Sequence, residues 1–276
     1  MTPPLREHCE HMNGTALFEL LAAICALLAA IFIFDQHLHR PRPHKLMWTL
    51  GLLFYGLAAG ADFLGALGGW TVGEYKAWYF FGGVLTAAFL GLGSLYLLAP
   101  RRVGHIATTI AVVIAVYAGA RILFFAPFSA ADIHTLATAP TSVITNVRAF
   151  KPLPGDLEIA AVVMNIPGAL LLFGGAAWSA WQFWRKRAGG YRLASMILLA
   201  LGSVFPSILT GLQALGNSSG AAVGEFLGAL CLLAGLLISL DVFTVFRVPF
   251  THITLYERAA SAPVAKAQAA KPEAAQ

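Results

Sequence analysis

Seven long apolar segments, separated by short polar connections, follow one another along the chain. They cover residues 15–34, 46–69, 77–99, 105–127, 158–184, 193–215 and 221–246. A helix rises about 1.5 Å per residue, so about 20 residues cross a hydrocarbon core of about 30 Å. The runs are continuous, unlike the alternating strands of a membrane β-barrel. The pattern therefore predicts an all-α polytopic membrane protein, a bundle of seven transmembrane helices.

The same pattern divides the chain into a membrane domain with polar ends. Residues 1–14 are expected to form a short segment outside the membrane, and residues 15–250 the transmembrane domain. Residues 259–276, rich in Ala with Lys and Pro, are typical of a disordered cytoplasmic tail. The one long connection, residues 128–157, is expected outside, either as a lid over a cavity or as a tether between two groups of helices.

The distribution of basic residues predicts the orientation of the helices. Thirteen of the eighteen Lys and Arg residues fall in connections on one side of the predicted membrane, and Arg121 lies inside a span. Those on the other side are Arg6, Lys76, Arg148 and Lys151. Because Lys and Arg accumulate on the cytoplasmic side, we expect the N-terminus outside and the C-terminus in the cytoplasm.

Composition refines this interpretation. The chain is 58% hydrophobic and only 11% charged, as expected of a protein whose main partner is the lipid bilayer. The net charge of +5 comes from short inner connections, so we expect no nucleic-acid partner. The abundance of Ala, Gly and Leu favours a bacterial protein of the cytoplasmic (inner) membrane.

Six polar side chains inside the predicted spans fall in the outer half of the membrane. They are Glu19, Asp62, Arg121, Asn165, Gln213 and Glu225. An ionised side chain near the bilayer centre costs at least ~2.5 kcal/mol, so such groups usually face the bundle interior and pair with one another. Two interpretations remain open: a structural ion pair with carboxylates that reach the surface, or a ligand-binding pocket open to the outside.

The pocket interpretation assigns a role to each of these residues. Asp62 and Arg121 have opposite charges and the same depth, so we expect them to pair. Glu19 and Glu225 come from the first and last spans, which are neighbours in most closed seven-helix rings, and would add negative charge beside that pair. Such a site would respond to protons or cations, with Asn165 and Gln213 as neutral ligand contacts.

Several kinds of chemistry lack the residues that they need. No Lys lies within a span, which excludes a retinal Schiff base. No His lies deep in a span, which argues against an intramembrane zinc hydrolase or a Ser–His protease. The sequence therefore predicts no catalytic residue, no metal site and no cofactor.

Three functions remain compatible with the sequence. We expect first a non-enzymatic membrane protein that binds or translocates a small ligand or ion through an outward-facing polar pocket. A receptor that senses a ligand and signals to a cytoplasmic or membrane partner protein is the alternative. A membrane enzyme acting on lipid comes third, with Asp62, Glu19 or Glu225 as its acid or base. The inner half of the predicted bundle has few polar groups, which favours a one-sided site.

Overall fold

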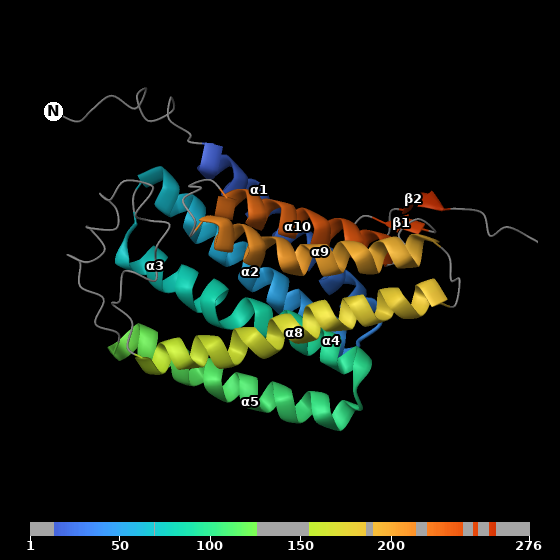
Figure 1. The fold of residues 1–276 in the computed structure, drawn as a ribbon, viewed down its shortest axis with the longest axis horizontal. Coiled ribbons are helices and arrows are strands. Elements are labelled where there is room, and N and C mark those ends of the chain that lie inside the picture. The colour runs from blue at the N-terminus through green and yellow to red at the C-terminus, as the bar shows by residue number, and fades with distance from the viewer. Residues whose placement is uncertain are drawn as a thin grey trace, which may run out of the picture.

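The structure of the chain is a computed structural model. It describes residues 14–68, 70–125, 155–185, 190–213, 220–239, 245–247 and 254–257. Within these residues the chain forms seven helical segments, followed by a short pair of strands (Figure 1). The predicted outer segment before Gly14, the tail 259–276 and residues 128–154 of the predicted outer loop lie outside the described residues.

The helical segments correspond one to one to the predicted spans. They are α1 (Gly14–His39), α2 (Pro43–Gly68), the continuous run of α3 (Val72–Trp78), η2 (Tyr79–Thr86) and α4 (Ala87–Leu98), α5 (Arg101–Ala120) continued by η3 (Arg121–Phe125), α8 (Gly155–Arg185), α9 (Gly190–Gln213) and α10 (Gly220–Ser239). The first five segments are long and apolar enough to cross a membrane, and α9 and α10 are apolar over shorter stretches. The prediction of a helical protein is confirmed, and five of its helical segments are candidates to span a membrane by length and composition.

The end of the last predicted span differs from the prediction. That span reaches residue 246, whereas α10 ends at Ser239 and β1 (Val245–Arg247) pairs antiparallel with β2 (Thr254–Glu257). Residues 242–249 are rich in Val, Phe and Thr, which favour strands. High hydrophobicity was therefore not sufficient to make residues 245–247 helical.

Local sequence signals explain where several helices begin. Pro43 occupies the first position of α2, where its missing N–H costs nothing. At the start of α3, the Thr71 hydroxyl accepts a hydrogen bond from the Glu74 backbone N–H at 3.2 Å, and the Glu74 carboxylate accepts one from the Thr71 N–H at 2.9 Å. This capping box satisfies two N–H groups that the helix itself leaves free.

Six of the helical segments close into a ring, and the α5–η3 segment lies outside it. The neighbours around the ring are α1, α2, α4, α8, α9 and α10, and α10 packs back against α1. Helix α5 packs against the outer side, on α4, α8 and η2 (Figure 1). Its side chains Ile106, Val113 and Val116 remain 63%, 63% and 67% exposed. A row of exposed β-branched side chains is suited to contact with lipid.

Small residues allow the helices of the ring to approach closely. Helix α1 buries a face of alanines that includes Ala22, Ala26 and Ala29. Where α4 crosses α8, the backbones meet at Gly91 and Gly168, and a methyl group at either glycine would overlap the opposite backbone. Close backbone contact at small residues is how helices associate in membranes, where hydrophobic burial contributes little.

Candidate functional site

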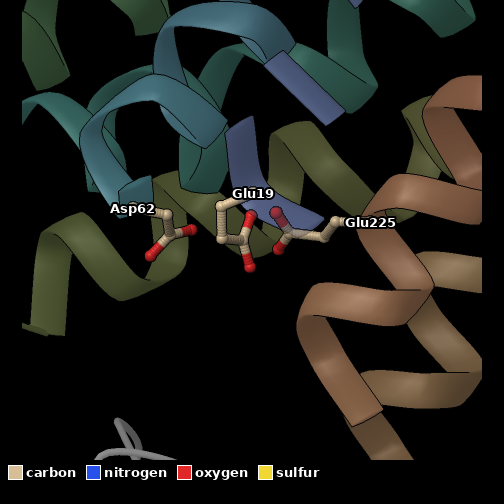
Figure 2. Close-up of side chains that lie close together, drawn as sticks. All are labelled: Glu19, Asp62 and Glu225. Atoms are coloured by element: carbon tan, nitrogen blue, oxygen red, sulfur yellow. The ribbon is translucent and has the colours of Figure 1, made fainter. Parts of the chain in front are cut away.

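Three carboxyl groups come together between α1, α2 and α10. They belong to Glu19, Asp62 and Glu225, and one oxygen from each lies within 4.8 Å of the others. Figure 2 shows Glu19 between the other two side chains. We call these three residues the carboxyl cluster.

The positions of the three residues in their helices explain their common level. Glu19 follows the start of α1 by five residues, Glu225 follows the start of α10 by five, and Asp62 precedes the end of α2 by six. At about 1.5 Å per residue, each lies about 8 Å from the end of its helix. Helix α1 packs against both α2 and α10, so carboxyl groups at the same level of these helices come close together.

The cluster is largely removed from solvent. The Glu19 side chain is 5% exposed, and its Oε2 atom has no hydrogen-bond partner among the described residues. Asp62 and Glu225 are half-buried. Glu19 and Glu225 lie within hydrogen-bonding reach of each other, and Trp78 lies within reach of Asp62. A buried polar atom without a partner is rare in native structures, because desolvation is not compensated.

Contacts that do not involve the carboxyl groups hold their helices in place. The Tyr55 hydroxyl donates a hydrogen bond to the backbone carbonyl of Glu225 at 2.8 Å, which joins α2 to α10. The rings of Phe18 and Phe226 lie 5.8 Å apart and join α1 to α10. A methyl group at Gly56 would overlap the Leu27 side chain, so α1 lies directly on α2 there. Packing therefore brings three acidic groups together despite their like charge.

The expected partner of Asp62 lies elsewhere. Arg121 binds Asp156 instead, with Nε–Oδ2 and Nη2–Oδ1 distances of 2.8 and 3.3 Å. The Tyr117 hydroxyl also donates to Asp156, at 2.6 Å. The predicted Asp62–Arg121 pair is therefore wrong. Arg121 follows α5, which packs outside the ring, and so it meets the start of α8 rather than α2. We call Arg121, Asp156 and Tyr117 the Arg121 group.

The two neutral residues are not seen at the cluster. The Asn165 amide in α8 donates a hydrogen bond to the carbonyl of Gly83 in the π-helical segment η2. Gln213 ends α9, and its side chain lies outside the described residues. Of the six predicted site residues, the structure brings together Glu19, Asp62 and Glu225.

Sequence reasoning did not give Tyr55, Trp78 or Asp156 a role at these sites. Tyr55 precedes Asp62 by seven residues, two helical turns, and therefore shares its face of α2; that spacing was a usable signal. Trp78 lies in the third predicted span, 77–99, and no pattern in the sequence links it to Asp62. Asp156 lies in the predicted outer connection 128–157, and no pattern in the sequence pairs it with Arg121.

The cluster has no basic partner in the described part of the chain. The ion pairs there join Arg121 to Asp156 and His39 to Asp35. Three carboxylates at this spacing repel one another strongly in apolar surroundings. Protonation or a bound cation would relieve this repulsion. Chemically, the arrangement offers oxygen ligands and proton acceptors.

The opposite half of the ring interior is apolar. A cavity of about 190 Å³ lies there between α2, α4, α8, α9 and α10. Its polar side chains are Trp48, Ser94 and Ser179, and the Trp48 indole N–H is already bonded to the Leu90 carbonyl at 3.1 Å. Among the described residues, no acidic or basic side chain lines the cavity, so these residues do not continue the carboxyl cluster as a charged path.

No protein-family model matches the chain, and neither the curated proteins nor the solved structures contain a match to it.

Proposed function

We propose that this chain is a seven-span protein of a bacterial cytoplasmic membrane that binds a small cationic ligand or an ion at the carboxyl cluster. The single observation that carries the proposal is the convergence of Glu19, Asp62 and Glu225 from three helices without a basic partner in the described residues. A positively charged ligand would relieve their repulsion and partner the buried Glu19 oxygen.

The proposed orientation places the cluster on the outer side. With the N-terminus outside, the starts of α1 and α10 and the end of α2 face the exterior, as the positive-inside distribution predicts. Reporter fusions at Gly189 and Gln276 should then report the cytoplasm, and a fusion at Thr138 the exterior. A cytoplasmic signal from Thr138 would overturn this topology.

The apolar inner cavity favours binding over translocation. A translocated cation would need polar groups along its path, and the cavity offers mainly hydrocarbon and two hydroxyls. This observation supports the alternative in which binding on the outside is sensed by a partner protein. A ligand that stabilises the protein but is not taken up by proteoliposomes would favour that alternative.

Thermal stabilisation of the purified protein by a panel of cations tests the proposal. The panel contains alkali ions, divalent metals and organic ammonium compounds. At least one class should raise the melting temperature of the wild type and not that of the Asp62→Asn/Glu225→Gln double variant. Arg121→Gln is the matched control, because it removes a charge outside the cluster and should keep the response. A wild type that no cation stabilises would overturn the proposal.

A further inference from the structure

We propose that the carboxyl cluster takes one divalent, oxygen-preferring metal ion of the size of Ca²⁺. This inference rests on the proposed function and specifies the class of cation. It is drawn from the donor atoms, their spacing and the buried Glu19 oxygen, which has no hydrogen-bond partner among the described residues.

The donor atoms select hard cations. Among the described His, Cys, Asp and Glu residues, the group that converges within 4.8 Å consists of the three carboxylates. Imidazole and thiolate ligands suit Zn²⁺ and Cu²⁺ or Cu⁺, whereas carboxylates and water suit Mg²⁺, Ca²⁺ and Mn²⁺. The cluster therefore favours a hard divalent ion that completes its coordination with water.

The spacing agrees with a single ion in contact with all three side chains. Oxygen ligands lie about 2.3–2.6 Å from Ca²⁺, so two of them on opposite sides are separated by about 5 Å. The cluster oxygens lie within 4.8 Å of one another, which is within the separation that two ligands of such an ion can have. Mg²⁺ holds its ligands at about 2.1 Å and demands near-octahedral geometry, which three carboxylates from three separate helices meet less readily than the flexible geometry of Ca²⁺.

The Glu19 side chain supplies an independent indication of a ligand. It is 5% exposed, and its Oε2 atom has no hydrogen-bond partner among the described residues. The side chain lies between those of Asp62 and Glu225 (Figure 2). A cation held by all three groups would coordinate this oxygen. Because Glu19 is the most buried of the three, it would contribute a fixed ligand, with Asp62 and Glu225 completing the site.

Charge balance favours a divalent ion over a monovalent one. The ionised cluster carries three negative charges, and the described residues supply no positive charge beside it. A monovalent ion would leave two of these charges uncompensated in apolar surroundings, and a divalent ion leaves one. Trp78, within hydrogen-bonding reach of Asp62, would share that remaining charge and orient the carboxylate.

A bound ion would connect the ends of the ring. Glu19 belongs to the first helix and Glu225 to the last, and Asp62 lies on the neighbour of the first. Ligands from three helices convert metal binding directly into stability of the folded bundle. The metal would therefore act on the outer side as a clamp between α1, α2 and α10.

Terbium luminescence tests the assignment on the full-length protein in detergent. Tb³⁺ resembles Ca²⁺ in size and oxygen preference, and it emits when a nearby indole is excited. Because Trp78 lies beside Asp62, indole excitation should give saturable Tb³⁺ emission at one ion per chain. Ca²⁺ should displace Tb³⁺ more effectively than Mg²⁺, and Na⁺ should not displace it.

Variants locate the emitting ion. Glu19→Gln, Asp62→Asn and Glu225→Gln should each weaken Tb³⁺ binding about 10- to 100-fold. Trp78→Phe should reduce the indole-excited emission, while direct Tb³⁺ excitation still reports saturable binding. Asp156→Asn is the matched control, because it removes a carboxylate that already has a basic partner, and its binding should equal that of the wild type.

The wild-type titration decides the inference even if a cluster variant fails to fold. Absence of saturable Tb³⁺ emission together with absence of stabilisation by Ca²⁺ would overturn the metal assignment. If organic ammonium compounds or alkali ions then stabilise the protein, the proposed function stands and only the metal is wrong. If no cation class has an effect, both proposals fail. Emission that Asp156→Asn abolishes would also overturn the assignment, because the ion would then lie at the Arg121 group.

Discussion

Two acidic sites in this protein differ in how their charges are compensated. In the Arg121 group, Asp156 accepts hydrogen bonds from a guanidinium and from a phenol, and both Arg121 and Asp156 are about one-third exposed. In the carboxyl cluster, three acidic side chains lie together, and Glu19 is buried while Asp62 and Glu225 are half-buried. The first site is complete within the chain. At the second site, the described residues supply no positive charge, which is why we propose a ligand there.

The largest effect that we expect from this difference is on the stability of the protein: removal of one carboxylate should raise it at the carboxyl cluster and lower it at the Arg121 group. Without divalent cations and at alkaline pH, Asp62→Asn should stabilise the protein, because it removes repulsion on the order of 3 kcal/mol per pair of charges at an effective dielectric constant of about 20. Asp156→Asn should destabilise it, because Arg121 loses its partner. Melting temperatures in a chelator measure both effects. A loss of stability in both variants would remove the distinction between the sites.

The second prediction concerns the contact that holds α8, and with it Asp156, against its neighbour α4 in the ring. Gly168→Ala should destabilise the bundle by about 1–3 kcal/mol, because its methyl group would overlap the Ala87 carbonyl. Gly174→Ala, on the same helix, is the control: a methyl group there meets nothing within 4 Å, and alanine favours the helix. Unfolding in detergent compares the two. Equal effects would contradict the close crossing of α4 and α8.

A smaller effect is expected within the Arg121 group. Exposed ion pairs contribute little to stability, so Arg121→Gln and Asp156→Asn should each cause a slight loss. The loss in the double variant should be smaller than the sum of the two, because both changes remove the same interaction. Tyr117→Phe, which keeps the ion pair and removes one hydrogen bond, serves as an internal comparison. Strictly additive changes in melting temperature would show that the pair is not formed.

The smallest coupling is expected between the two sites. Asp62→Asn and Arg121→Gln act on groups with different partners, so their effects on melting temperature should add. Clearly non-additive changes in melting temperature would instead support the Asp62–Arg121 pair that was predicted from the sequence. The result therefore tests whether the two sites are as separate as the structure places them.

Much of the helical architecture could be predicted because lipid imposes a simple requirement on the chain. Backbone groups in hydrocarbon must be paired within the helix, so apolar length alone located seven helical segments close to their observed bounds. The exception was the end of the last segment, where apolar residues with strand preference form β1. No pattern of similar simplicity along the sequence indicates which helices become neighbours.

The sequence by itself determined the depth of each polar side chain, because depth follows from counting residues along a helix. That was sufficient to select Glu19, Asp62 and Glu225 as groups at one level, and it was equally consistent with a partner for Asp62 in Arg121. Only the tertiary structure decided between partners at the same depth. Close packing of small residues joins α1, α2 and α10 and leaves α5 outside the ring, so three like charges meet while the arginine turns to Asp156. Packing between helices determines which neighbouring helix a side chain faces. The positions of polar residues along each helix do not contain that information.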